Sequence, residues 1–267
     1  MKFVIDPAKS RIFATLFDIL SSIVDELNIE FRKNEIYIQT MDSARISLFE
    51  LVLKEDWFET YDVEESVVIG VKLSIINKIL NCRHPTQSIE FEFSGVNDDK
   101  LDISLVNGGK GTFNKFYQTS VYEFDSELLS IPEVDADAEF TINSITIFKL
   151  FEQLKQFGDN ITINCDEKNI QIKTIESEDF TGMKVNIPED DIVEYSVIED
   201  ETINVEYSIM PISKAFSLAR LSKDANISDN FSIYVSKESP IMIEFNLFGE
   251  SNIKFWVAPK ISLDDDD

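Results

Sequence analysis

The sequence contains a long internal repeat. Shifting the numbering by 134 residues places 27–53 over 161–187 without a gap, and apolar residues meet apolar residues along the whole stretch. The segments just upstream also match, with Leu20 falling on Leu154. A repeat whose period is close to half of the 267 residues predicts two domains of one design. It argues against a single catalytic pocket built from scattered residues.

The bulk composition is that of a globular chain. A length of 267 residues can hold two ordinary domains, and a hydrophobic content of 43% is typical of soluble folds. No run of about 18 apolar residues is present, so no membrane span is expected. The start lacks an apolar leader, and Cys82 and Cys165 lie in separate repeats, which favours a non-secreted protein. A net charge of −26 argues against non-specific binding to DNA or membranes by the chain as a whole.

Each half is predicted to follow the order helix, hairpins, helix, hairpins. Apolar residues at helical spacing predict helices at 9–27, 73–80, 144–157 and within 209–222. Asp6-Pro7 is a start signal for the first, and a left-handed Gly158 is expected to end the third. Period-two alternation predicts a hairpin over 28–53 that turns at Lys33-Asn34. The other predicted strands are 67–71, 88–93, 101–106, 112–120, 161–165, 170–175, 182–187, 231–235, 241–245 and 253–257.

Strands outnumber helices, so the sheets are predicted to be mostly antiparallel. The expected fold is therefore α+β, with two similar domains of antiparallel sheets that carry helices on one face. Between them, 121–139 has seven acidic residues and no basic one. We expect an N-terminal domain at 1–120, an acidic connector at 121–139, and a C-terminal domain with an acidic tail at 140–267.

No motif for catalysis or metal binding survives inspection. His84 is the one histidine, and Cys82 beside it leaves too few ligands for zinc. The glycines around Lys110 lack the first Gly of a phosphate loop, and Phe140 replaces the Gly that a calcium loop needs after 135–139. We predict no cofactor, no metal and no enzymatic activity.

Five segments resemble, in order, segments of the eukaryotic proliferating-cell nuclear antigen family. They are 38–48, 70–82, 128–133, 158–165 and 255–261. The resemblance identifies the chain as a divergent member with the DNA-clamp fold. It implies a homotrimeric ring, lined by helices, that slides on double-stranded DNA and tethers DNA polymerase, the clamp loader and other replication and repair proteins. It also implies no catalysis and a nuclear location, or a replication compartment if the protein is viral.

The resemblance places basic residues of the helices toward DNA. They are Lys9, Arg11, Lys78, Lys149, Lys155, Lys214 and Arg220. The alternative is ordinary solvated surface charge. The first helix carries Ala14, Thr15 and Ser21 where the family usually has lysines, so DNA contact is expected to be weak and topological. Pro211 obscures the register of the last helix.

The resemblance also implies a hydrophobic groove for partner peptides beneath the connector. Its residues are Met41, Ile46, Leu48, Leu129, Ile131, Pro240, Trp256, Ala258, Pro259 and Ile261. An apolar cleft beside an acidic connector suits basic, hydrophobic peptides. The alternative is that these residues fill the core. The groove and the core are equally favoured for Met41, Ile46 and Leu48. The groove is favoured for Ile131, Pro240 and 256–261.

The segments 112–120 and 179–187 are predicted to be exposed sheet edges that pair between subunits. They could instead be protected edges of a monomer. Other functions also remain open: a processivity factor that binds DNA without closing a ring, a subunit of a heterotrimeric checkpoint clamp, or an acidic interaction scaffold that never binds DNA.

Overall fold

The computed structural model describes residues 1–95, 99–125, 128–131, 135–174, 181–223 and 227–260. Contacts divide the chain into two compact units. The first comprises Met1–Ser43, Phe49–Leu129 and Leu247–Ile253, and the second comprises Ala44–Leu48, Ser130–Asn246 and Lys254–Asp267.

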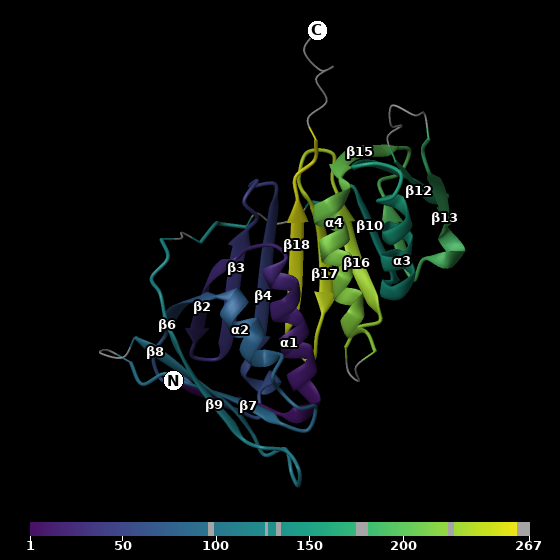
Figure 1. The fold of residues 1–267 in the computed structure, drawn as a ribbon. Coiled ribbons are helices and arrows are strands. Elements are labelled where there is room, and N and C mark those ends of the chain that lie inside the picture. Colours follow the sequence, from purple (N-terminus) through teal and green to yellow (C-terminus); the bar gives the residue numbers. More distant parts are fainter. Residues whose placement is uncertain (96–98, 126–127, 132–134, 175–180, 224–226, 261–267) are drawn as a thin grey trace. The chain divides into compact units, whose positions relative to one another are not determined.

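The first half of the chain runs strand, helix, five strands, helix, three strands, with a 3₁₀ turn inside the series (Figure 1). Its elements are β1 (Lys2–Ile5), α1 (Pro7–Ser21), β2 (Glu26–Arg32), β3 (Glu35–Met41), β4 (Ser47–Lys54), η1 (Glu55–Trp57), β5 (Thr60–Asp62), β6 (Val67–Lys72), α2 (Leu73–Leu80), β7 (Ser88–Glu92), β8 (Lys100–Val106) and β9 (Lys115–Ser120).

The second half repeats this order element by element and adds one short 3₁₀ turn. Its elements are β10 (Ala138–Asn143), α3 (Ser144–Leu154), β11 (Asn160–Asp166), β12 (Asn169–Thr174), β13 (Lys184–Pro188), η2 (Glu189–Asp191), β14 (Glu194–Val197), β15 (Ile203–Ser208), α4 (Ile209–Phe216), η3 (Ser217–Leu221), β16 (Asn230–Val235), β17 (Ile241–Asn246) and β18 (Asn252–Val257). The offset of 134 carries β2 onto β11 and η1 onto η2. The predicted repeat and the α+β fold are confirmed.

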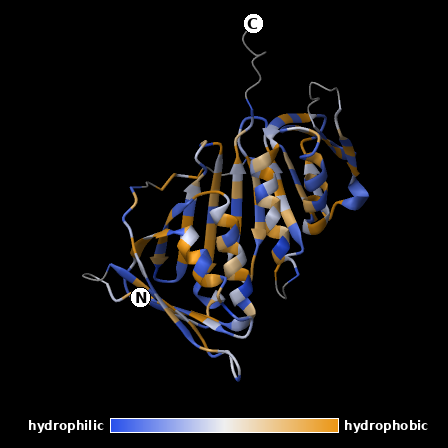
Figure 2. Cartoon of the chain, viewed as in Figure 1, coloured by the Kyte–Doolittle hydropathy of each residue, from blue (hydrophilic) through white to orange (hydrophobic). Residues whose placement is uncertain are grey.

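The strands follow the same antiparallel order in both units. In the first, the strands run β5-β1-β7-β8-β9 and β4-β3-β2-β6, and in the second they run β14-β10-β16-β17-β18 and β13-β12-β11-β15. Ile29 lies opposite Ile69 between β2 and β6, and Ile163 lies opposite Val205 between β11 and β15. Figure 2 shows the short acidic turn that follows β13 as a hydrophilic segment.

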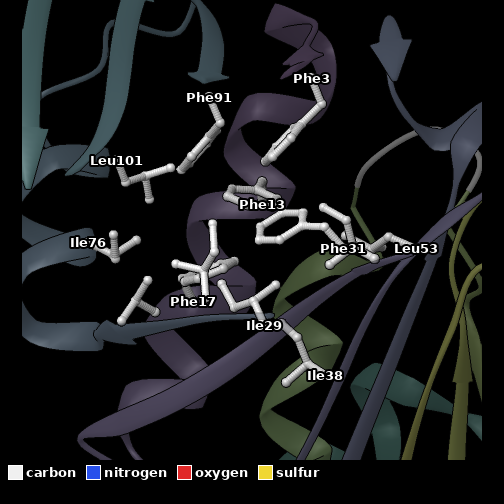
Figure 3. Close-up of a pocket in the computed structure, with 13 residues that line it drawn as sticks. Phe3, Phe13, Phe17, Ile29, Phe31, Ile38, Leu53, Ile76, Phe91 and Leu101 are labelled. Carbon is white, nitrogen blue, oxygen red and sulfur yellow. The ribbon is translucent and has the colours of Figure 1, made fainter. Parts of the chain in front are cut away.

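The core of the first unit is closely filled. Figure 3 shows aromatic and aliphatic side chains from α1, α2 and several strands converging on one point. The rings of Phe3 and Phe91 stack with centroids 4.7 Å apart, and Phe13 meets Phe91 edge-on at 5.6 Å. The cavity left among them is about 10 Å³, which is the space of a single water-sized probe and too small for a ligand.

Helix α1 begins where the sequence predicts and ends earlier. Asp6 caps it, accepting a hydrogen bond from the Lys9 N–H at 3.0 Å, and Pro7 occupies the first turn. The predicted end at residue 27 is wrong, because the helix stops at Ser21 and Leu27 pairs with Val71 in the sheet. The apolar stripe continued past the helix because the following strand also needs apolar residues.

Helix α3 ends without a left-handed glycine. The helix stops at Leu154, and Lys155 at the cap has φ −63°. Tight turns follow, with the Gln156 N–H bonded to the Gln153 carbonyl and the Phe157 N–H to the Leu154 carbonyl. The predicted role of Gly158 is wrong, since these bonds already satisfy the last carbonyls and Gly158 is not among the positive-φ glycines.

Strand β10 begins inside the segment predicted as a connector. Ala138 pairs with both Val235 and Val197 and is buried. Apolar alternation did not predict the short strands β1, β5 and β14. No helix in the described part of the chain is long and apolar enough to cross a membrane.

Candidate partner-binding and DNA-facing surfaces

The start of the connector lies against the strands of the first unit. Gly70 and Tyr122 exchange two main-chain hydrogen bonds, of 3.0 and 2.9 Å. A β-carbon at Gly70 would lie 2.5 Å from the Tyr122 carbonyl oxygen and 2.7 Å from the Phe124 ring. The glycine is therefore required by the close approach of the connector.

Two amide side chains hold the connector further along its course. Asn28 on β2 donates from Nδ2 to the Phe124 carbonyl oxygen at 2.8 Å. Gln39 on β3 bonds both main-chain groups of Leu129: Nε2 donates to the carbonyl oxygen at 3.0 Å, and Oε1 accepts from the N–H at 2.7 Å. The connector is thus bonded to β6 at Tyr122, to β2 at Phe124 and to β3 at Leu129.

A polar network on β3 and β4 holds the side-chain amide of Gln39. The Tyr37 hydroxyl accepts from Gln39 Nε2 at 3.1 Å and donates to Glu50 Oε1 at 2.8 Å. The Arg32 guanidinium covers the Tyr37 ring, 3.8 Å from its centroid. Burial, and then the hydrogen bond to the Glu50 carboxylate, raise the pKa of the Tyr37 hydroxyl. The hydroxyl therefore stays protonated and holds both partners at physiological pH.

The first unit places two predicted groove residues at exposed or half-exposed positions. Met41 ends β3, two residues beyond Gln39 and on the same face. Leu129, with its neighbour Leu128, keeps its side chain exposed (45% and 48%) while its main chain is bonded. The connector thus offers apolar side chains outward from a fixed backbone.

The second unit holds another part of the predicted groove, in which Ala258 and Ile46 are in contact. The Ala258 N–H donates to the Ile46 carbonyl at 2.9 Å, and two residues on, the Lys260 N–H donates to the Glu206 carbonyl at 2.8 Å. The half-buried or exposed members here are Ile46, Leu48, Ile131, Pro240, Ala258 and Pro259. Trp256 is only 6% exposed, which favours the core alternative for that residue. Ile261 lies outside the described residues.

Lys9 differs from its predicted role. Its ammonium donates to the Trp57 carbonyl at 2.6 Å and lies 4.8 Å from the centroid of the Phe248 ring. Asp6 is 3.9 Å away, and the side chain is only 21% exposed. This geometry does not favour DNA contact by Lys9, because a phosphate would have to compete with partners inside the unit.

The other predicted cations lie nearer to solvent. Arg11, Lys78, Lys149 and Arg220 are exposed, and Lys214 is half-buried on α4. Lys155 follows α3 and pairs with Glu152. Burial and, next, the nearby charge of Arg11 lower the pKa of the Arg83 guanidinium.

Both predicted edge strands lie at the ends of their strand orders. β9 closes the five-stranded sheet of the first unit, and β13 closes the four-stranded order of the second. Phe116 on β9 is 73% exposed, and Phe113 just before it is 82% exposed. Large apolar side chains on an open strand edge mark a surface able to pair with another chain.

Gln39 and Asn28 are the site residues that sequence interpretation missed. Alternation along β2 and β3 places both on the face opposite the buried residues Leu27, Ile29 and Ile38, which was the only signal. Which outward amide meets the connector depends on the path of a segment some 90 residues away.

Comparison with known proteins matches almost the entire chain to one family. The N-terminal domain model of proliferating cell nuclear antigen matches residues 5–140, and the C-terminal domain model matches residues 130–260. The chain is 24% identical to proliferating cell nuclear antigen of Chaetomium thermophilum over 260 residues, covering 96% of this chain and 97% of that protein.

Two further relatives have similar coverage. Identity is 21% to proliferating cell nuclear antigen 2 of Drosophila melanogaster, covering 96% of both chains. It is 25% to a probable DNA polymerase sliding clamp 2 of Paramecium bursaria Chlorella virus 1, covering 94% of this chain and 88% of that one. The duplicated fold and both family matches lead to one assignment: the chain belongs to the proliferating cell nuclear antigen family, whose members are sliding clamps and processivity factors rather than enzymes.

Proposed function

We propose that this protein is a homotrimeric ring that encircles double-stranded DNA and holds a DNA polymerase on its template. In this proposal 1–120 and 140–267 are the two clamp domains and 121–139 is the connector between them. The observation that carries it is the match to both clamp domain families along almost the entire chain. The protein would act in replication and repair, in the nucleus or in a viral replication compartment.

Subunits would join through the edges β9 and β13. The exposed ring of Phe116 supports this, because an edge strand that exposes large apolar side chains is otherwise an aggregation hazard. Heterologous pairing of two different edges closes into a ring when the rotation between copies is right.

DNA would be held loosely by cations of the helices. We propose Arg11, Lys78, Lys149, Lys155, Lys214 and Arg220 for this role, and leave out Lys9. Few cations, some already paired, give weak phosphate contact that depends on salt, which suits a protein that must slide.

Partner proteins, including the polymerase and the clamp loader, would dock short basic, hydrophobic peptides on the apolar residues of the connector and the C-terminal segment. The exposed side chains of Leu128 and Leu129 support this docking. The net charge of −26 would attract such peptides and speed their association.

The central test combines light scattering with polymerase product length on primed circular DNA. We expect a particle of three chains and longer products once the clamp is loaded. A monomer that leaves product length unchanged would contradict the proposal, and a monomer that lengthens products would favour a processivity factor without a ring.

The edge is tested by Phe116→Asp. This variant is expected to fold, since the side chain is exposed, and to run as a monomer. Val68→Asp is the matched control, because Val68 is also exposed (58%) and apolar on a strand edge but lies outside the proposed contact. Trimers of both variants would count against β9 as the subunit contact.

The docking surface is tested by titrating a labelled basic peptide of the QxxLxxFF type. Ile131→Ala combined with Pro259→Ala should weaken binding at least about tenfold if these residues anchor the peptide. Val193→Ala with Ile198→Ala is the control, since both are exposed apolar residues outside the groove. Equal peptide affinity of the two double variants would contradict the role of this groove in peptide binding.

A further inference from the structure

We propose that Gln39 is a positioning residue that fixes the connector on the sheet and thereby presets it for partner peptides. This inference rests on the proposed docking function and extends it to residues not yet given a role. The feature that carries it is the pair of hydrogen bonds between one side-chain amide and both main-chain groups of Leu129.

The amide of Gln39 uses its hydrogen-bonding capacity almost fully. Oε1 accepts from Leu129, and Nε2 donates both to Leu129 and to the Tyr37 hydroxyl. An amide that meets an N–H and a C=O of one residue can satisfy both only in one orientation. Exchanging its oxygen and nitrogen would face donor to donor and acceptor to acceptor, so the contact selects one placement of the connector.

Tyr37 fixes that orientation from the other side. Its hydroxyl donates to the Glu50 carboxylate, so the oxygen that remains can only accept, and Gln39 Nε2 is the donor it meets. The ring itself is held under Arg32, whose guanidinium is bonded to Glu30 and Glu35. The chain Glu50–Tyr37–Gln39–Leu129 therefore runs from β4 through β3 to the connector as a continuous series of hydrogen bonds.

The consequence for binding is preorganisation. Leu128 and Leu129 are exposed, and the main chain of Leu129 is already bonded, so a partner does not pay the full cost of ordering that segment. Without Gln39 the same side chains would be present, but on a segment that samples several positions. Affinity would fall although no apolar contact is lost.

Hydrogen exchange at the Leu129 amide tests the contact without any partner. Gln39→Ala should speed exchange about five- to tenfold, the size expected for one or two exposed hydrogen bonds. Gln39→Glu should speed exchange less than Gln39→Ala does, because a carboxylate still accepts from the Leu129 N–H but cannot donate to the Leu129 carbonyl oxygen. Gln171→Ala is the matched control, since Gln171 lies on the equivalent strand β12 and bonds only to Asn186 in the described structure.

Peptide titration tests the consequence. Gln39→Ala should weaken binding of the basic peptide about fivefold, and Gln39→Glu should also weaken it at neutral pH because a carboxylate cannot donate to the Leu129 carbonyl. Tyr37→Phe should show a smaller loss of peptide affinity. It removes the hydrogen bond that orients the Gln39 amide but keeps the amide atoms that bond Leu129. Circular dichroism and melting temperature of all variants confirm that the unit is folded.

The outcomes separate the two proposals. If Leu129 exchange is the same in Gln39→Ala and the wild type, the positioning role is wrong. If exchange rises but peptide affinity does not change, the connector is fixed by Gln39 without being preset for binding, and the proposal is overturned. If the wild type binds no peptide while exchange responds as expected, the proposed docking function is wrong. The hydrogen bonds between Gln39 and Leu129 would then still fix the connector, but not for peptide binding.

Discussion

The carbonyl oxygen of Tyr122 lies 2.5 Å from the point where a β-carbon on Gly70 would stand. No real side chain tolerates that distance, so Gly70→Ala must move the connector away from β6. We expect a loss of about 1–3 kcal/mol in the free energy of unfolding, as for other overpacked sites, and faster proteolysis within 121–131. Urea denaturation and limited digestion measure both. Val68→Ala, on the same strand but exposed, should change neither.

Lys9 is expected to be a structural lysine. Lys9→Met keeps the aliphatic stem but removes the charged donor to the Trp57 carbonyl, which should cost about 1–2 kcal/mol of stability. Lys78→Met, at an exposed position, should stay within about 0.5 kcal/mol of the wild type. Thermal or urea unfolding compares the two. Equal stability of both variants would contradict the inward role of Lys9.

The Glu35 carboxylate should make stability depend on pH. Burial by itself would raise its pKa, but hydrogen bonds from Lys54 and Arg32 outweigh it and hold the pKa below the ordinary 4.5. A lowered folded pKa contributes stability above the unfolded value, and that contribution is lost as pH falls through the folded one. The stability difference between the wild type and Glu35→Gln should therefore shrink as pH falls below 4.5. Partial exposure limits the difference at neutral pH to less than about 1 kcal/mol.

The control for Glu35 is the exposed residue Glu64. Glu64→Gln should give a difference from the wild type that is small at every pH. Urea titrations between acid and neutral pH on the three proteins supply the comparison, and a Glu35→Gln difference that grows toward acid pH would reverse the predicted sign.

The two cysteines should react at very different rates. Cys165 is buried on β11, and burial followed by the nearby Asp166 charge raises the pKa of its thiol to about 12. Cys82 is exposed after α2. A thiol reagent at pH 8 should label one cysteine quickly in the folded protein and two in denaturant, because the thiolate is the reactive form. Cys82→Ser should abolish the fast reaction. Two fast-reacting thiols in the native wild type would contradict the burial of Cys165.

Sequence patterns predicted most of the fold because the repeat and the apolar periodicity are local. Helix α2 was predicted at its observed bounds, since Leu73, Ile76 and Leu80 repeat on one side of a short segment. The end of α1 was not, because Ile23 and Leu27 continue the apolar stripe and only pairing with β6 ends the helix. Short strands such as β5 carry too few residues to show a period.

The candidate sites divide in the same way. The two sheet edges followed from strand order, and exposed apolar residues such as Leu129 followed from the family resemblance. The sequence did not predict that the Lys9 side chain points inward. Its partners Trp57 and Phe248 lie 48 and more residues away in sequence. Long-range side-chain contacts carry no periodic signal that a single sequence could show.

The bonds of Gln39 reach the main chain of Leu129 and not its side chain. Substitutions at residue 129 can therefore change which partners the connector attracts while its course stays the same. Across relatives only 21–25% identical, a contact of this kind would let binding preferences drift independently of the scaffold. Single substitutions in the connector could thus change the set of binding partners of such a clamp while its fold stays the same.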